Sequence, residues 1–320
     1  MITCDMKTTA ALISAAGKIA ITAHVKPDPD ALGSTLALGL ALRKIGKEVL
    51  MTVDDELPTS LGFMPHLTDI KNLDEFSNQA VDLLIVLDAS DRERSGRVPE
   101  VFTGPILNID HHISNKGFSD YRYLDVKAAA TGEIIYQLLI ELNVDMDLDI
   151  AKNLYTAIVT DCGFFQYSNT TKKTMEFAAQ LLDHGVKPDE IQYALESKTR
   201  SSVELLAEVL KTLEFFAEDK IAVLSLENNK YDPQTDTEGF ISFARYISGV
   251  EIAVFIKEID TDITRVSMRS RDIDVSNVAL HFGGGGHARA AGCTIKGNLA
   301  ESKKLLLEQL KKVVAESQHA

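Results

Sequence analysis

The chain is short of the features that mark secreted and membrane proteins. Its only cysteines, Cys4, Cys162 and Cys293, are odd in number and far apart. They support neither a disulfide framework nor a zinc site, and they are typical of a reducing compartment. No apolar run approaches the ~18 residues that span a bilayer, and the N-terminus lacks the basic and apolar segments of a signal peptide. We therefore expect a cytoplasmic protein that does not associate with membranes.

Positive charge is scarce too. The 320 residues include 33 Lys and Arg against 47 Asp and Glu, which gives a formal net charge of -14. This balance argues against a surface that binds long duplex nucleic acid. A small substrate that carries phosphate remains compatible with it, because metal ions bound by some of the acids would invert the field locally.

Length and hydrophobic pattern predict an α/β protein of two domains. Strand-like and helix-like segments alternate over the first 185 residues or so, which predicts βαβ units and a parallel sheet. We expect a parallel-sheet domain at 1–185, a helical linker at 186–216 and a smaller α/β domain at 217–320. The predicted strands are 19–23, 48–53, 83–87, 106–109, 221–226, 252–259 and 263–269, and the main predicted helices are 31–46, 131–142, 148–160 and 299–316.

Aspartates and histidines gather in short clusters, most of them directly after a predicted strand. The clusters in the first domain are His24, Asp28 and Asp30; Asp88; Asp110, His111 and His112; and Asp161. The carboxyl ends of parallel strands line one edge of a sheet, so these residues are expected to converge there. Like charges packed together must be neutralised by protons or cations. The pattern predicts a site for divalent metal.

The first cluster contains two prolines, Pro27 and Pro29. They predict an extended loop without helix through the acids, in which Asp28 and Asp30 project to the same side. Asp30 is expected to cap the helix that follows. The alternative is a capped turn with a solvated acidic loop.

The other clusters also have structural alternatives. Asp88 could simply cap a helix. His111 and His112 are expected to point to opposite sides after their strand, so that one contacts metal and the other substrate. Asp161 is expected at a helix C-terminus, where an acid opposes the helix dipole.

A glycine run, Gly283–Gly286, precedes His287 in the second domain. Glycines let backbone amides approach an anion closely, although a flexible loop is the alternative. Arg269 and Arg271 end a predicted strand, where the alternative is solvated edge charge. The remaining histidines, His66, His184, His281 and His319, belong to no cluster and are interpreted as structural or surface residues.

Taken together, these motifs resemble those of the DHH/DHHA1 phosphoesterase superfamily. Its signature triplet is Asp110-His111-His112 here, its other N-terminal motifs match the remaining clusters in order, and the Gly-Gly-Gly-His-x-x-Ala-Ala-Gly signature of its second domain stands at 284–292. The residue after Asp161 is often Thr in relatives and is Cys162 here, which puts one hydrogen bond near the site in doubt. The compact length resembles the NrnA-type members, which act as oligoribonucleases and 3′-phosphoadenosine 5′-phosphate phosphatases.

The resemblance implies two metal ions and the residues that hold them. One ion would bind His24, Asp28 and Asp88, and a second would bind Asp30, Asp88, His111 and Asp161, with Asp88 bridging. Mixed imidazole and carboxylate ligands suit Mn²⁺, with Mg²⁺ or Co²⁺ as substitutes. Two ions ~3.5–4 Å apart would bind a bridging water and direct hydroxide at phosphorus.

The resemblance also implies roles for the residues that do not bind metal. His112 would lie beside the substrate phosphate, and Asp110 would orient a neighbouring histidine. From the second domain, Arg269, His287 and the amides of Gly284, Gly285 and Gly286 would grip the nucleotide's other phosphate, with the active site in the cleft between the domains.

The leading hypothesis is therefore a Mn²⁺-dependent hydrolase of very short RNA, of dinucleotides such as pApA and of 3′-phosphoadenosine 5′-phosphate. The alternatives are a phosphodiesterase specific for linear or cyclic dinucleotides and a non-catalytic nucleotide sensor. The glycine-His signature counts against a family II pyrophosphatase, and the length leaves no room for the extra domains of a RecJ-type exonuclease. The sequence leaves open whether the chain is a monomer or a homodimer.

Overall fold

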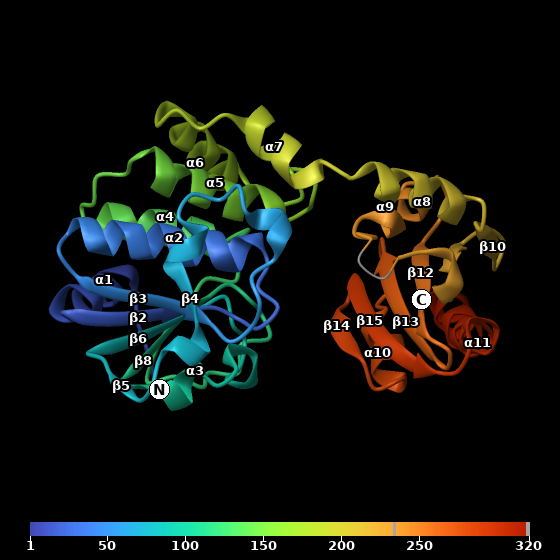
Figure 1. Cartoon of the computed structure of the whole chain (residues 1–320), viewed down its shortest axis with the longest axis horizontal. Coiled ribbons are helices and arrows are strands. Elements are labelled where there is room, and N and C mark those ends of the chain that lie inside the picture. The colour runs from blue at the N-terminus through green and yellow to red at the C-terminus, as the bar shows by residue number, and fades with distance from the viewer. Residues whose placement is uncertain (233–234, 318–320) are drawn as a thin grey trace. The chain divides into compact units, whose positions relative to one another are not determined.

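The computed structural model describes residues 1–232 and 235–317, with the backbone alone for His287. Contacts between residues divide the chain into two compact units, Met1–Glu196 and Ser197–Ala320 (Figure 1). The division falls inside the segment 186–216, which the sequence predicts to be a helical linker. Helix α7 (Pro188–Glu196) belongs to the first unit, and α8 (Arg200–Leu210) belongs to the second.

A seven-stranded sheet in the order β1-β9-β8-β6-β2-β3-β4 forms the centre of the first unit, and every neighbouring pair of its strands is parallel. A short parallel pair, β5 and β7, lies apart from it. The strands are β1 (Ile2–Thr3), β2 (Lys18–Thr22), β3 (Glu48–Val53), β4 (Ile70–Asn72), β5 (Gln79–Ala80), β6 (Leu83–Leu87), β7 (Phe102–Thr103), β8 (Ile106–Asp110) and β9 (Tyr121–Leu124).

The central strands are apolar on both faces. Leu83, Ile85 and Leu87 pack into the main hydrophobic core, whereas Leu84 and Val86 pack into a second cluster on the opposite face. Side chains alternate between the faces of a strand, so a strand covered on both sides reads as one continuous apolar run. This is why the run 83–87 reports a central strand so clearly.

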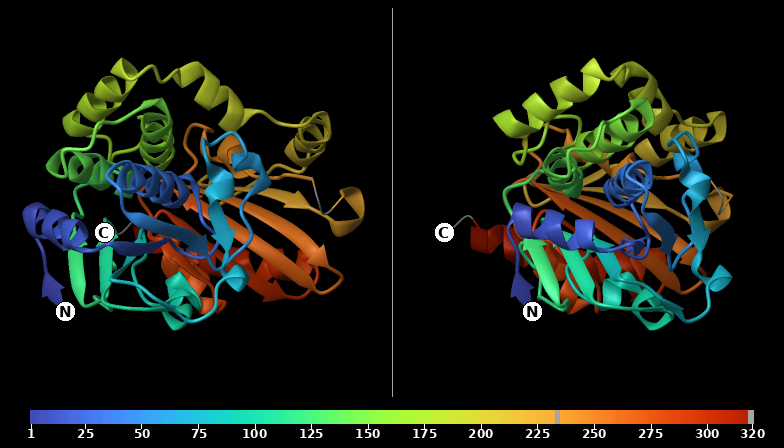
Figure 2. Two further views of the ribbon diagram at one scale, coloured as in Figure 1. Left: turned by 60° about the vertical axis from the view of Figure 1, so that its left-hand side comes forward. Right: turned by 90° about the vertical axis from the view of Figure 1, so that its left-hand side faces the viewer.

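Helices α2, α4 and α5 cover the side of the main core (Figures 1 and 2). Helices α2 and α5 approach closely at Gly33, where a Cβ would lie 2.5 Å from the carbonyl oxygen of Asn153. Glycine is therefore required there, and it sets the first turns of α2 against the helix that ends at Asp161. The helices are α1 (Met6–Ala15), α2 (Pro29–Lys44), α3 (Val98–Val101), α4 (Thr131–Glu141), α5 (Leu148–Asp161) and α6 (Lys172–Asp183).

The second unit contains a six-stranded mixed sheet in the order β10-β11-β12-β13-β15-β14. Only β11 and β12 pair in parallel; the other neighbours are antiparallel. Its strands are β10 (Glu214–Phe216), β11 (Ile221–Leu226), β12 (Ile252–Asp260), β13 (Ile263–Ser270), β14 (Gly285–His287) and β15 (Ala290–Lys296), and its further helices are α9 (Phe240–Arg245), α10 (Ser276–His281) and α11 (Leu299–Ser317).

The predicted α/β class is confirmed, with a parallel sheet in the first unit and a mixed sheet in the second. The long apolar strands were predicted to within one residue at each end. The short edge strands β1 and β4, and the short strand β9 beside β1, were not, because they have no apolar run of their own. Along 1–232 and 235–317, no helix is both long and apolar enough to cross a membrane.

Candidate metal centre

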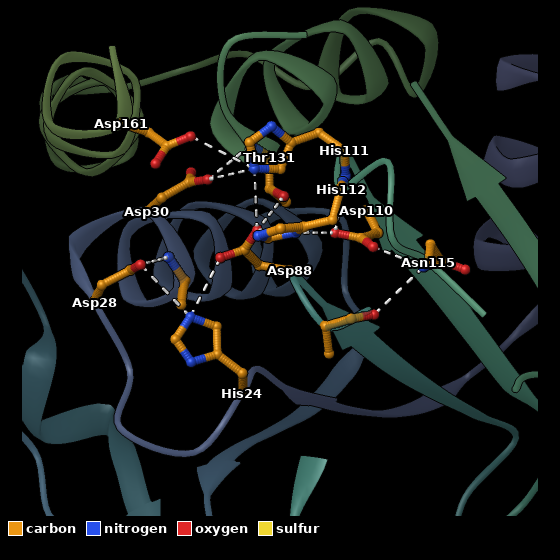
Figure 3. A network of polar contacts seen from close by, with 12 residues as sticks. His24, Asp28, Asp30, Asp88, Asp110, His111, His112, Asn115, Thr131 and Asp161 are labelled. Atoms are coloured by element: carbon orange, nitrogen blue, oxygen red, sulfur yellow. Dashed lines mark hydrogen bonds and ion pairs between the residues drawn. The ribbon is translucent and has the colours of Figure 1, made fainter. Parts of the chain in front are cut away.

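The Asp and His clusters of the first unit converge at the carboxyl edge of its sheet (Figure 3). His24 lies two residues beyond β2, Asp88 follows β6 directly, and Asp110 is the last residue of β8. Helix α5 brings Asp161 to the same place at its C-terminus. The convergence expected from strand topology is therefore found.

The segment around Pro29 differs from its prediction. Helix α2 begins at Pro29 itself, and Asp28 is its N-cap, whose Oδ1 accepts the amide of Ala31 at 2.9 Å. Proline fits the first helical position because that position needs no N–H donor. Asp30 therefore lies in the first helical turn and is not the cap. The two acids do not project together, since Asp28 lies beside His24 (3.6 Å) and Asp30 lies towards His111 (3.9 Å).

Asp88 is the central residue of the cluster and is 2% exposed. Its backbone has φ 55°, a left-handed conformation that is rare outside glycine and that concentrates at functional sites. Its Oδ2 lies 3.4 Å from Nε2 of His24, and its Oδ1 lies 3.5 Å from Nε2 of His111. The two oxygens of one carboxylate thus face two different histidines.

Both of these histidines present Nε2 to the acids. Nδ1 of His24 donates to the carbonyl of Val25 at 2.8 Å, and Nδ1 of His111 donates to the carbonyl of Ala128 at 3.2 Å. A carbonyl only accepts, so in each neutral ring the lone pair is at Nε2. Nε2 of His24 is buried and makes no hydrogen bond in the described structure. This is the arrangement that metal-binding histidines adopt.

His111 and His112 do not point to opposite sides. Their rings meet edge to face with centroids 4.6 Å apart, and Nδ1 of His112 lies 3.6 Å from Oδ1 of Asp88. The alternation expected of a strand fails because β8 ends at Asp110, one residue before the pair.

Asp110 is fully buried and holds His112 in place. Its Oδ1 accepts Nδ1–H of His112 at 2.7 Å and the amide of His111 at 2.9 Å, while its Oδ2 accepts Nδ2–H of Asn115 at 2.6 Å. Asn115 in turn donates to Asn108 at 2.8 Å. Neither asparagine is among the residues predicted from the sequence, although Asn108 stands out as the polar residue within a buried strand.

The cluster perturbs its own protonation. Burial alone would lower the pKa of His24, but Asp28 and Asp88 raise it to about 10. Asp88 and Asp30 likewise raise the pKa of His111 to about 10 against the effect of burial. Although burial opposes it, His111 and His24 hold the pKa of Asp88 well below its usual range. Without metal, protons on the histidines supply the positive charge that the acids require.

Two acids of the cluster, Asp161 and Asp30, have raised pKa values even with these histidines nearby. Burial, with Asp88 adding to it, raises the pKa of Asp161 to about 6, although His111 opposes the shift. Burial and the charges of Asp88 and Asp161 raise the pKa of Asp30. The surplus of negative charge is what a bound cation would remove.

Three groups of side chains offer ligand atoms within 4.8 Å of one another. They are Asp88 with His111 and His112, His24 with Asp28 and Asp88, and Asp30 with His111 and Asp161. The donor set consists of carboxylate oxygens and imidazole nitrogens. Backbone carbonyls orient the rings of His24 and His111, and Asp110 orients that of His112. Such a set fits divalent ions such as Mn²⁺.

The predicted substrate residues lie in the second unit. Arg269 is half-buried on β13, and its guanidinium donates to the carbonyl of Met268 at 3.0 Å. The second half of the glycine run is part of a sheet, because Gly285–His287 form β14. The amide of Gly284 donates to the carbonyl of Ala279 at 2.9 Å, so it does not face an anion as the sequence suggested. The side chain of His287 lies outside the described part of the chain.

Two family models match this chain, the N-terminal domain of the DHH family over residues 18–160 and the DHHA1 domain over residues 218–316. The chain belongs to the DHH/DHHA1 phosphoesterases. It is 34% identical to the bifunctional oligoribonuclease and PAP phosphatase NrnA of Thermus thermophilus, over 92% of this chain and 90% of that protein. It is 28% identical to the protein of the same name from Bacillus subtilis, over 88% and 91% of the two chains.

A solved structure is similar to this chain along nearly its whole length. An exopolyphosphatase-related protein from Bacteroides fragilis matches with a TM-score of 0.89 and 26% identity, over 96% of this chain and 95% of that one. Family membership and fold therefore rest on independent comparisons.

The raised pKa of His24 makes a prediction for the metal-free protein. The pKa of His24 is about 10 in the folded protein and 6.5 in the unfolded chain, so its protonation stabilises the fold. The stabilisation is complete below pH 6.5 and is lost as the pH rises through 10. Between pH 6 and 9, chelator-treated wild type should lose more unfolding free energy than His24→Gln, by on the order of 2 kcal/mol. Urea unfolding at both pH values measures this. The control is His66→Gln, at an exposed histidine, and a loss in His24→Gln equal to that of wild type would contradict the prediction.

Proposed function

We propose that this protein is a Mn²⁺-dependent phosphoesterase that hydrolyses short oligoribonucleotides. Its substrates would include dinucleotides such as pApA, cleaved to mononucleotides, and 3′-phosphoadenosine 5′-phosphate, cleaved to AMP. The observation that carries the proposal is the buried Asp88 carboxylate, whose two oxygens face His24 at 3.4 Å and His111 at 3.5 Å. A carboxylate in this position suits a pair of cations. The Thermus thermophilus relative, named for both activities, supports this choice of substrates.

The first unit would supply the chemistry. Two divalent ions, when bound, supply Lewis-acid polarisation of a phosphoryl oxygen and lower the pKa of water. His24, Asp28 and Asp88 would hold one ion, and Asp30, Asp88, His111 and Asp161 would hold the other. The carbonyls that fix the tautomers of His24 and His111 also fix the direction of their Nε2 lone pairs, so the protein prepares these ligands before metal arrives.

His112 would act on the substrate. Its Nδ1–H is committed to Asp110 at 2.7 Å, so a protonated His112 carries its second proton on Nε2. That proton can pass to the oxygen that leaves phosphorus as the P–O bond breaks, while the hydrogen bond to Asp110 holds the ring in orientation. His112 also lies with Asp88 and His111 in a group of side chains that could hold a metal ion. Its competing role is therefore that of a metal ligand, and experiment can distinguish the two roles.

The second unit would supply nucleotide recognition. Arg269, the amides of Gly285 and Gly286, and His287 would bind the phosphate that is not being cleaved. A guanidinium suits that task because it can donate two parallel hydrogen bonds to a phosphate.

A first experiment tests the function as a whole. Purified protein should hydrolyse pApA, oligoribonucleotides of two to five residues and 3′-phosphoadenosine 5′-phosphate with Mn²⁺, and should lose this activity with chelator. Asp88→Asn, which keeps the shape of the side chain but weakens both proposed ion sites, should reduce kcat by at least about 10³-fold. Rates can be followed by chromatography of the products. Hydrolysis of cyclic or linear dinucleotides alone would favour the dinucleotide-specific alternative, and binding without turnover would favour a nucleotide sensor.

A second prediction concerns His112. His112→Ala should keep two Mn²⁺ per chain while kcat for pApA falls by about 10²–10⁴-fold, because the proton donor is lost and the ion ligands remain. Metal content after gel filtration in dilute Mn²⁺ and steady-state rates give the two quantities. One ion per chain in His112→Ala would instead identify this histidine as a ligand.

A third prediction separates recognition from chemistry. Arg269→Ala should keep both ions and weaken hydrolysis of nucleotides by about 10–150-fold, since a charge-assisted hydrogen bond contributes roughly 1.5–3 kcal/mol. Hydrolysis of bis-p-nitrophenyl phosphate should change less than about threefold, because that ester has no second phosphate to bind. Arg265→Ala, on the same strand, is the matched control. Equal losses on both substrates would assign Arg269 to the fold or to the metal centre.

A further inference from the structure

Helix α4 begins without a side-chain cap of its own. Its N-cap residue is Ala130, which offers no oxygen for the first amides of the helix. The amide of Thr131 donates instead to Oδ2 of Asp30 at 2.8 Å, and the amide of Gly132 donates to Oδ1 of the same carboxylate at 2.9 Å. Asp30, from α2, therefore takes the place of the missing cap, and the start of α4 is anchored to the metal centre.

The side chain of Thr131 contacts a second carboxylate of the centre. Its hydroxyl donates to Oδ1 of Asp88 at 2.9 Å, and the whole residue is buried (Figure 3). Thr131 thus bonds to Asp30 through its backbone and to Asp88 through its side chain. Since the backbone of Thr131 is fixed by the first bond, its hydroxyl is delivered to Asp88 from a fixed position.

This contact bears on the rotation of the Asp88 carboxylate. The terminal torsion of an aspartate is soft, with broad wells, so its two oxygens do not hold their directions without outside contacts. Rotation would turn Oδ2 away from His24 and Oδ1 away from His111, which now lie at 3.4 and 3.5 Å. A donor on Oδ1 opposes that rotation and leaves Oδ2 to face His24.

We propose that Thr131 is a positioning residue, which fixes the rotation of the Asp88 carboxylate so that this one group can serve two cations at once. The inference rests on the proposed metal centre. Thr131 itself is neither a ligand nor a substrate contact, and its effect passes through Asp88. The sequence offered no signal for it, because a threonine at the start of a predicted helix is explained by the helix alone.

Three substitutions isolate the hydroxyl. Thr131→Ser keeps it, Thr131→Ala removes it together with the methyl group, and Thr131→Val removes it while keeping the shape. Mn²⁺ titration of chelator-treated protein by calorimetry should show two ions in wild type. In Thr131→Ala and Thr131→Val the weaker ion should bind about 10–100-fold less tightly, which is the usual effect of losing a group that orients a ligand. Thr131→Ser should stay within about threefold of wild type.

The kinetic pattern should separate positioning from a purely structural role. With Mn²⁺ high enough to fill both sites, kcat of Thr131→Val should recover to within about tenfold of wild type and KM for pApA should not change, because every ligand is still present. Thr9→Val is the matched control: Thr9 is a buried threonine on α1 whose hydroxyl donates to the carbonyl of Asp5 at 2.8 Å, away from the centre. It should leave both Mn²⁺ affinities unchanged.

Either of two results from the variants would overturn the inference: Mn²⁺ affinities in Thr131→Ala as high as in wild type and Thr131→Ser, or affinities in Thr131→Ser reduced as much as in Thr131→Ala. Should Thr131→Ala fail to fold by circular dichroism, the comparison of Thr131→Val with Thr131→Ser decides. Wild type that binds two Mn²⁺ ions but hydrolyses no nucleotide would end the proposed function and leave this inference intact. Wild type that binds one ion would end the inference.

Discussion

The first unit depends on holding several carboxylates together at the edge of an apolar sheet. Asp30, Asp88 and Asp110 are almost wholly buried, and burial of unpaired charge is among the most expensive events in folding. The chain offsets this cost with donors from every side: backbone amides from α4 on Asp30, a hydroxyl on Asp88, and the Asn115 amide with two backbone amides on Asp110. Two histidines complete the balance with positive charge that a metal ion can replace.

Hydrogen bonds also fix the orientation of the histidine rings in the cluster. The carbonyls of Val25 and Ala128 bind Nδ1 of His24 and His111, so Nε2 of each ring faces the acids, whereas Asp110 accepts Nδ1–H of His112. Each of the three rings is therefore held in one orientation. A site prepared in this way loses little conformational entropy when ions bind, which is the advantage of rigid support around a metal centre.

The two units contribute different physical properties. The first carries the buried acids of a parallel sheet edge, whereas the second offers an edge strand of glycines and half-buried Arg269 on a mixed sheet. Acids suit cations, and arginine with backbone amides suits phosphate. The family to which the chain belongs combines both units, and the relatives named as oligoribonucleases and PAP phosphatases are matched along about nine-tenths of their length.

The sequence by itself determined the elements with a strong periodic or apolar signal, such as the run 83–87, and the residue types of the centre. Strand topology then predicted that His24, Asp88 and Asp110 would meet, because parallel strands end at one edge. The sequence did not predict two details of local geometry. Pro29 starts a helix, and His111 and His112 lie together beyond the end of β8. The contact of Asn115 with Asp110 depends on the conformation of the loop that follows β8. Tertiary structure alone brought Thr131 to Asp30 and Asp88, because contacts between residues far apart in sequence arise only when helices and strands pack, and no local pattern encodes them.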